Sequence, residues 1–123
     1  METSGKPLNG GQILANALVR QGVDLAFGVP GESFLPLLNG LVDHPQFQFI
    51  TCRQEGGAAY MAEAYGKLTG KPGVIMVTRG PGASNAMVGV HTAYQDSTPM
   101  VLLVGQVGTD MVEREAFQEI DYR

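Results

Sequence analysis

Glu55 is the residue whose type and position in this sequence best suit chemistry. It begins a predicted helix over residues 54–69, which follows a predicted strand over residues 47–51, and Arg53 and Gly56 lie close beside it. A carboxylate at a helix start often only complements the helix dipole, a contribution of about 0.3–1 kcal/mol. The helix end and Arg53 would favour the charged carboxyl whereas burial would oppose it, and a group balanced in this way suits proton sharing. Both interpretations stay open, and the second predicts a catalytic Glu55.

A second candidate is the glycine-rich stretch over residues 80–85, which reads GPGASN. It stands between a predicted strand and a predicted helix, as nucleotide-binding loops do. However, Asn85 takes the position of the third glycine in G-x-G-x-x-G, and the sequence contains no G-x-x-x-x-G-K-[ST]. A tight turn in which the glycines adopt positive φ explains the stretch equally well. On this pattern alone, a non-catalytic nucleotide-binding α/β module stays an alternative.

Residues that bind metals or form disulfides are scarce. Cys52 is the one cysteine, so no disulfide can form within the chain, and His44 and His91 lie far apart in the sequence. Metal sites need several cysteine, histidine or carboxylate ligands at short spacings. We therefore predict no metal site in this sequence, a solvated loop position for His44 and a structural role for His91.

The elements that must position these residues alternate between helix and strand patterns. Apolar residues at i, i+3 and i+4 spacing predict helices, and the helix over residues 54–69 is apolar or small on nearly all sides, which predicts burial. Continuous apolar runs predict buried strands. The predicted helices cover residues 9–21, 33–41 with Ser33 as a cap, 54–69 and 83–94; the predicted strands cover residues 25–29, 47–51, 73–78 and 99–105; residues 80–82 form a predicted turn.

This alternation predicts an α/β fold, a doubly wound and mostly parallel sheet with helices on both faces. Residues 113–123 carry neither a cap nor a closing strand, so we expect the chain to be truncated before the C-terminal edge of its domain. Ligands of such sheets bind beyond the carboxyl ends of the strands, near helix N-termini. This rule selects the loops over residues 29–33, 51–57, 78–85 and 105–109.

Composition narrows the classes of protein. A chain of 123 residues, 44% hydrophobic and 16% charged, has room for one globular domain. Its formal net charge of −4 supplies no basic stripe for nucleic acid. The polar start has no secretory pattern, and no apolar run approaches the roughly 18 residues that span a bilayer. We therefore predict a cytoplasmic protein with neither nucleic-acid nor membrane partners.

Four stretches then become specific enough to indicate a family. They are FGVPGES over residues 27–33, RQEGGAAYMAEAYGKLTGKPGV over 53–74, TRGPGASNAMVGVHTAYQDSTPMVLLVGQV over 78–107, and EAFQEID over 115–121. In order and spacing they resemble the N-terminal domain of acetolactate synthase and related thiamine-diphosphate enzymes. The resemblance runs from about residue 8 to the end and is far more specific than one glycine turn. It implies that residues 1–123 are part of a pyrimidine-binding domain.

The resemblance implies a role for Glu55. In that family a glutamate at this position hydrogen-bonds N1′ of the aminopyrimidine and favours the imino tautomer, whose 4′ nitrogen removes the thiazolium C2 proton. The resulting carbanion attacks a 2-keto acid. The implied activity is that of a carboligase or decarboxylase, foremost acetolactate synthase, which converts pyruvate to acetolactate and CO2 in branched-chain amino acid biosynthesis. A decarboxylase of other 2-keto acids or of acyl-CoA is the near alternative, whereas glyoxylate carboligase, which lacks the activating glutamate, is disfavoured.

The resemblance also implies positions for other residues around the cofactor. Val29, Pro30, Thr78, Pro81 and Asn85 would line the pyrimidine pocket, Gly31 would lie beside the reacting centre, and Phe117 and Gln118 would face the substrate region.

Three departures from the family pattern concern side chains near this site. Gln54 and Gly56 flank Glu55 where many acetolactate synthases read R-H-E-Q, Glu32 stands where a second glycine is common, and Tyr60 replaces a histidine. These changes leave the substrate open but not the class of cofactor.

The other side of the cofactor site is missing from the sequence. In that family a separate C-terminal domain holds the diphosphate and Mg²⁺ through a G-D-G motif and a downstream asparagine, and this sequence contains no G-D-G. The resemblance implies that the central and diphosphate-binding domains are absent, and that the site is shared between subunits of a homodimer or homotetramer. We therefore expect the chain alone to be inactive.

Overall fold

Four parallel strands form the centre of the fold in the computed structural model, which describes residues 7–122. The order across the sheet is β2 (Gln48–Thr51), β1 (Leu25–Gly28), β3 (Gly73–Thr78) and β4 (Met100–Gly105). All three pairings are parallel, so the prediction of a parallel sheet is confirmed. The first six residues and Arg123 of the predicted domain lie outside the described residues.

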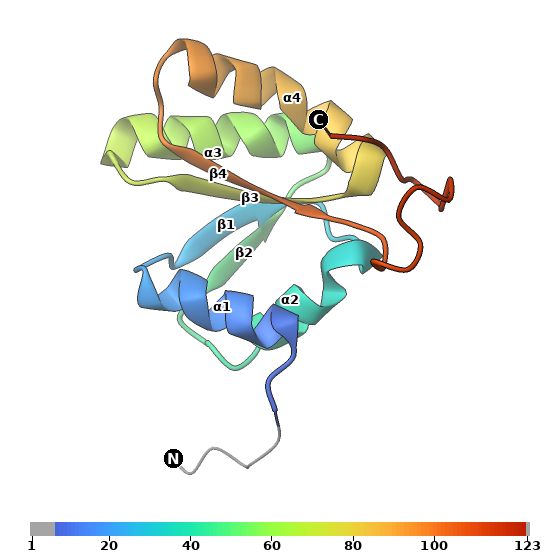
Figure 1. Cartoon of the computed structure of the whole chain (residues 1–123). Helices are drawn as coiled ribbons and strands as arrows, with labels where there is room; N and C mark the ends of the chain where they lie inside the picture. Colours follow the sequence, from blue (N-terminus) through green and yellow to red (C-terminus); the bar gives the residue numbers. More distant parts are fainter. Residues whose placement is uncertain (1–6, 123) are drawn as a thin grey trace.

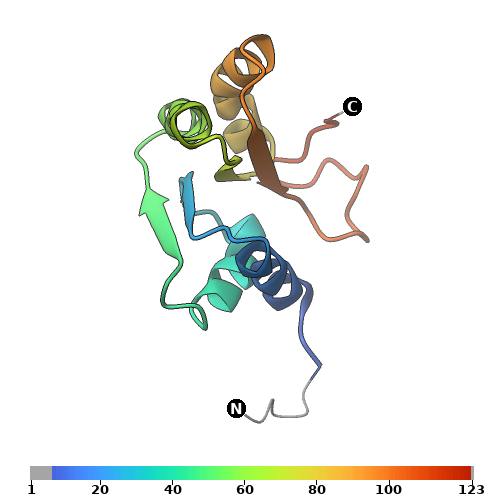
Figure 2. The same cartoon turned by 90° about the vertical axis from the view of Figure 1, so that its left-hand side faces the viewer.

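Helices cover both faces of this sheet (Figures 1 and 2). On one face lie α1 (Gly10–Arg20), the 3₁₀ turn η1 (Glu32–Phe34) and α2 (Leu35–Leu41); on the other lie α3 (Glu55–Thr69) and α4 (Arg79–Gln95). The predicted doubly wound arrangement is therefore confirmed. None of the helices between residues 7 and 122 is long and apolar enough to cross a membrane.

β3 is the most deeply buried strand and divides the core in two. Val74, Ile75, Met76 and Val77 are each at most 1% exposed. Because successive side chains of a strand point to opposite faces, Val74 and Met76 pack with α1 and α2, whereas Ile75 and Val77 pack with the alanines of α3 and α4. Each helical layer therefore has its own apolar cluster.

The first helix follows the local rules of helix ends closely. The Asn9 side chain accepts a hydrogen bond from the backbone N–H of Gln12, and the Gln12 side chain accepts one from the N–H of Asn9. This reciprocal pair satisfies two N–H groups that the helix leaves unpaired. After Arg20 the chain turns through Gly22, whose φ of +79° suits glycine. The predicted helix over residues 9–21 is confirmed to within one residue at each end.

The prediction of a turn over residues 80–82 is wrong, because α4 already begins at Arg79. Proline is tolerated in a first helical turn, where its missing N–H loses no intrahelical bond. Among the described glycines only Gly22 and Gly70 have positive φ, so Gly80 has another reason for lacking a side chain. A Cβ on Gly80 would lie 2.7 Å from Cγ2 of Ile120. Close approach of another segment, rather than backbone conformation, requires glycine there.

Two further local predictions are wrong. Ser33 lies inside η1 and caps no helix, because its hydroxyl bonds instead to Thr78 at 2.7 Å. The helix α3 is buried on one side only: Ala58 and Ala59 are fully buried, whereas Leu68 is 87% exposed. An apolar sequence pattern does not say what covers each side of a helix, and among residues 7–122 α3 packs mainly against α4 and the sheet.

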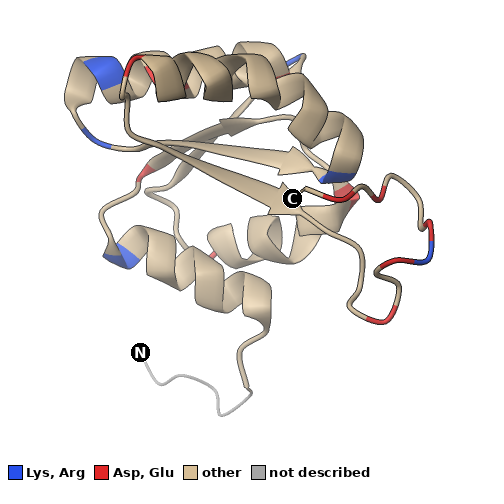
Figure 3. Cartoon of the chain, turned by 45° about the horizontal axis from the view of Figure 1, so that its top comes forward, with Lys and Arg blue, Asp and Glu red and all other residues tan. Residues whose placement is uncertain are grey.

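The chain after Gly105 forms turns and no further strand within the described residues. This C-terminal segment, residues 106–122, folds back toward the N-terminus of α4 (Figure 1) and contains many of the acidic residues (Figure 3).

Candidate active site

The candidate site lies where the parallel strands end. The loop after β1, the start of α3 after β2 and the start of α4 after β3 all lie at this edge of the sheet, as the sequence argument expected.

Glu55 and Asn85 meet at this edge. Nδ2 of Asn85 donates a hydrogen bond of 3.0 Å to Oε2 of Glu55. Within the described part of the chain this is the only hydrogen bond that the Glu55 carboxyl makes, so Oε1 is available to a ligand. The carboxylate lies in the first turn of α3, where the helix dipole favours negative charge. The arrangement gives an acceptor of fixed orientation, half-buried at the mouth of the site.

Small residues allow this meeting, because they let α3 and α4 pack closely. A Cβ added to Gly89 would lie 2.4 Å from the Cβ of Ala59. Nearer the site, a Cβ added to Gly56 would lie 3.2 Å from the backbone oxygen of Asn85. Gly56 thus departs from the family pattern at a point where the two helices have almost no space for a side chain.

Gln54 supports the helix rather than the carboxyl. Its Oε1 accepts a hydrogen bond of 3.0 Å from the N–H of Gly57 and so caps the N-terminus of α3. Arg53, which the sequence places beside Glu55, is exposed and forms no ion pair within the described residues. Arg53 therefore makes no direct contact with the Glu55 carboxyl in this part of the chain, and Asn85 is the neighbour that hydrogen-bonds it.

The loop that follows β1 packs on the end of β3. Gly31 lies so close that an added Cβ would be 2.6 Å from the Cβ of Thr78. The hydroxyl of Ser33 lies 2.7 Å from the Thr78 hydroxyl and joins the same two segments. Val29 is half-buried and Pro30 is exposed. Thr78 thus serves the loop after β1, while the Glu55–Asn85 pair lies between the two helices of the other layer.

The C-terminal segment reaches the start of α4 through its backbone. The N–H of Gly80 donates a hydrogen bond of 2.8 Å to the carbonyl of Gln118 and thereby satisfies one of the N–H groups that a helix start leaves free. Pro81 is exposed in the same turn. The Phe117 side chain also faces solvent, with the residue 72% exposed. This contact occupies one donor of the glycine-rich stretch and disfavours its use as a nucleotide cradle.

Sequence reasoning missed Arg79. Nη1 of this residue donates hydrogen bonds to Oε1 of Glu32 at 3.1 Å and to the carbonyl of Phe117 at 3.2 Å. The available signal was its position, since a basic residue directly follows a buried strand at the edge where ligands bind. Glu32, noted only as a departure from the family, is its partner.

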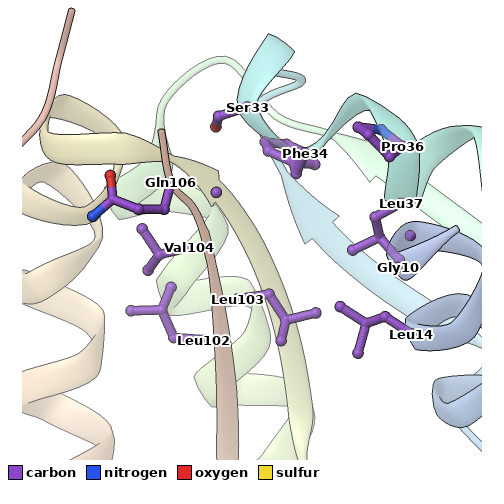
Figure 4. A pocket seen from close by; sticks show the side chains of 12 residues that line it. Gly10, Leu14, Ser33, Phe34, Pro36, Leu37, Leu102, Leu103, Val104 and Gln106 are labelled. Atoms are coloured by element: carbon purple, nitrogen blue, oxygen red, sulfur yellow. The ribbon is translucent and has the colours of Figure 1, made fainter. Parts of the chain in front are cut away.

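Two hollows lie apart from the Glu55–Asn85 pair. An apolar groove of about 350 Å³ runs along β4, where Leu103 points toward Leu14 and Leu37 from the opposite wall (Figure 4). A hollow of about 600 Å³ lies within the C-terminal segment, and half of the residues that line it are acidic. Within residues 7–122 no group of three or more His, Cys, Asp or Glu side chains could hold a metal ion. Neither hollow contains the residues that the family pattern assigns to the cofactor.

Comparison with known sequences decides the family. Residues 8–123 match the family described as "Thiamine pyrophosphate enzyme, N-terminal TPP binding domain". The chain belongs to this family. Thiamine pyrophosphate is another name for thiamine diphosphate, so the family named from four motifs in the sequence is confirmed.

Several proteins similar to this chain are acetolactate synthases. The chain is 44% identical over 121 residues to the mitochondrial catalytic subunit of Saccharomyces cerevisiae, covering 98% of this chain and 18% of that protein. It is 44% identical over 116 residues to the large subunit of Lactococcus lactis, and 41% identical over 114 residues to the isozyme 3 large subunit of Escherichia coli. These matches cover 94% and 93% of this chain and 20% of each relative. The chain thus spans about a fifth of the length of the relatives it matches.

Proposed function

We propose that this domain forms the pyrimidine side of a thiamine-diphosphate site and that Glu55 is its activating carboxylate. The observation that carries the proposal is the 3.0 Å hydrogen bond between Asn85 and Glu55, at the carboxyl ends of the strands, where open α/β sheets bind their ligands. The bond uses Oε2 and leaves Oε1 as an acceptor. Binding a protonated ring nitrogen requires an acceptor of fixed orientation. The half-buried Glu55 carboxylate is such an acceptor, because the neighbouring Asn85 amide restricts its orientation.

The bound cofactor would supply a nucleophilic thiazolium carbon for attack on a carbonyl. The residues of this chain would bind and orient its pyrimidine end: Glu55 would accept a hydrogen bond from the protonated N1′ and stabilise the proton on that nitrogen. Asn85 keeps the carboxylate turned toward the ring. Pro81, at the start of α4, and the loop over residues 29–31, packed on Thr78, would supply the walls of the pocket.

The diphosphate and Mg²⁺ would be held elsewhere. No cluster of ligands for a metal is present among residues 7–122, and the sequence has no G-D-G motif. We infer that a separate diphosphate-binding domain completes the site, across an interface in a homodimer or homotetramer. This chain alone would then lack the diphosphate contacts and would be inactive.

For the complete protein we propose acetolactate synthase activity, pyruvate to acetolactate and CO2, as a step of branched-chain amino acid biosynthesis. The relatives in yeast and in two bacteria carry that name. Phe117 and Gln118 would face the 2-keto acid substrate. A cytoplasmic location stays a prediction, since the yeast relative is named a mitochondrial subunit.

An activity assay of the complete protein with thiamine diphosphate, Mg²⁺ and pyruvate tests the proposal. We expect acetolactate, and we expect Glu55→Gln to lower kcat/KM by roughly 10²–10⁴-fold, because a neutral amide cannot hold the pyrimidine proton. Glu63→Gln, a glutamate of the same helix outside the site, is the matched control and should retain the reaction.

The outcomes test the substrate and the activating residue separately. Turnover of another 2-keto acid or of an acyl-CoA without acetolactate would reject the synthase assignment and keep the cofactor class. Full activity of the Glu55→Gln variant would reject Glu55 as the activating residue. Calorimetry on the isolated chain adds a further check, since binding of a nucleotide there would favour a non-catalytic binding module.

A further inference from the structure

Arg79 occupies a strained position at the junction between β3 and α4. Its φ is +22°, outside the regions that residues with a side chain commonly adopt. The side chain nevertheless turns inward and is only 15% exposed. Strain of this kind persists where surrounding contacts impose it, and it often marks a functional position.

The contacts of Arg79 join three separate segments. Nη1 carries two hydrogens, and it donates to Oε1 of Glu32 in the segment after β1 and to the carbonyl of Phe117 in the C-terminal segment. The two acceptors lie 47 and 38 positions away in the sequence. One guanidinium therefore ties the loop after β1 and the C-terminal segment to the start of α4.

A neighbouring contact docks the same segment. Gly80 donates its N–H to the carbonyl of Gln118, so consecutive residues of α4 hold consecutive carbonyls of the C-terminal segment. Gln118 itself has a φ of +64°, which is a left-handed conformation. The hydrogen bonds from Arg79 and Gly80 lie at this bend of the chain. Burial raises the pKa of Tyr122 near the end of this segment, and the charge of Arg79 acts in the opposite direction.

The two acceptors of Arg79 differ in what they contribute. The Glu32 side chain is 71% exposed, and ion pairs with an exposed partner contribute little because water and salt screen them. Nε of Arg79 is buried with no hydrogen-bond partner among the described residues. Buried polar groups without a partner are rare. The hydrogen bonds that hold this side chain are therefore those of Nη1. The bond to Phe117 is then the one that orders a segment.

We propose that Arg79 is a positioning residue. It holds Phe117 and Gln118 at the edge of the active site and thereby determines how well the substrate binds there. The inference rests on the proposed function, in which these two residues face the 2-keto acid. Glu32 has the smaller part of keeping the guanidinium in place. Arg79 and Glu32 are separate from the Glu55–Asn85 pair, which is proposed to bind the cofactor through other contacts.

Hydrogen exchange and steady-state kinetics together test this role. In Arg79→Gln we expect the amides of residues 117–120 to exchange about tenfold or more faster than in the wild-type protein, the effect of losing one net hydrogen bond. Arg79→Lys, which keeps a charged donor without the planar fork, should restore part of the protection. Glu32→Gln should change the exchange by about twofold or less, because the Glu32 side chain is itself exposed to water.

In the complete enzyme, Arg79→Gln should raise KM for the 2-keto acid by about tenfold while kcat falls less than about threefold, the pattern of lost substrate positioning. Affinity for thiamine diphosphate should stay unchanged. Lys67→Met, at the far end of α3, is the control for a loss of stability alone and should leave KM as it is.

Each outcome decides the inference. Unchanged exchange of residues 117–120 in Arg79→Gln would overturn the positioning role. Faster exchange with unchanged KM would overturn the link to substrate. If the wild-type enzyme turns over no 2-keto acid, the proposed function fails, and with it the substrate role of Arg79, whereas the exchange result still decides whether Arg79 holds the segment.

Discussion

Gly89 of α4 lies directly against Ala59 of α3: a Cβ added to Gly89 would be 2.4 Å from the Cβ of Ala59 and 2.7 Å from its carbonyl carbon. The two helices therefore pack almost backbone to backbone. This close packing brings their N-terminal turns together and allows Asn85 to reach Glu55.

Replacing Gly89 by alanine should force the helices apart. We expect Gly89→Ala to lower the free energy of unfolding by about 1–3 kcal/mol, because overpacking outweighs the better helix propensity of alanine. Denaturant unfolding of the chain measures this. Gly10→Ala is the matched control: an added Cβ there has no atom within 4 Å, so the free energy should change by about 0.5 kcal/mol or less. Equal stability of the two variants would contradict the packing argument.

Removing the amide of Asn85 should weaken cofactor activation without abolishing it. In the complete enzyme, Asn85→Ala should lower kcat/KM by roughly tenfold to a hundredfold, as a hydrogen bond to a charged group contributes about 1.5–3 kcal/mol. Asn85→Asp should be more harmful, since a second carboxylate would lie against Glu55 and like charges repel. If both variants are as active as the wild type, the hydrogen bond between Asn85 and Glu55 has no part in the reaction.

The stability of the α3–α4 pair should depend on alkaline pH through Lys67. Hydrogen bonds to Asp96 and then to Glu63 raise the pKa of Lys67 to about 12 from 10.5. A raised lysine pKa means that the native state binds the proton more tightly, so the stabilisation is complete below pH 10.5 and is lost as pH rises through about 12.

The difference in unfolding free energy between the wild type and Lys67→Met should therefore be constant from about pH 7 to pH 10 and shrink above that range. Urea unfolding at each pH measures it. A difference that stays the same through pH 12 would show that the charge of Lys67 is not what matters. At neutral pH Lys67→Met should be the less stable protein, because Glu63, 5% exposed, would keep only its bond from Thr98.

Acid should loosen the C-terminal segment through Glu119. Its carboxylate accepts backbone hydrogen bonds from Glu113 at 2.6 Å and from Ala116 at 3.1 Å, and these bonds lower its pKa. A lowered carboxyl pKa gives stabilisation that is present above the ordinary value of 4.5 and is lost as pH falls through the native-state value.

Amide exchange of Glu113 and Ala116 reports this loosening. After correction for the intrinsic pH dependence, we expect protection to fall below pH 4.5 in the wild type. Glu119→Gln should show weaker protection that does not depend on pH in this range. Protection that is equal in both proteins at pH 6 would contradict the role of the carboxylate.

Much of the fold could be predicted because its signals are local. A buried parallel strand is apolar throughout, as in residues 73–78, and the capping pair of Asn9 and Gln12 spans one turn. Errors arose where a local pattern has two meanings. Glycine indicates either positive φ or close approach, and Gly80 belongs to the second class because Ile120, 40 positions later, packs on it.

For the site, four motifs in order indicated a thiamine-diphosphate domain, and the alternation of helices and apolar strands indicated a sheet whose strand ends would bring Glu55 and Asn85 to one edge. The sequence alone therefore determined the family, the parallel layout and the candidate carboxylate, because each depends on residue order and periodicity.

Only the tertiary structure decided which neighbours these residues meet. It paired Glu55 with Asn85 instead of Arg53, joined Ser33 to Thr78, and placed the Phe117 carbonyl on Arg79. Such contacts join segments 30 to 45 positions apart, and they depend on the ångström-scale approach of whole helices and loops. No periodicity in the sequence encodes that approach, because it arises from the packing of all side chains together.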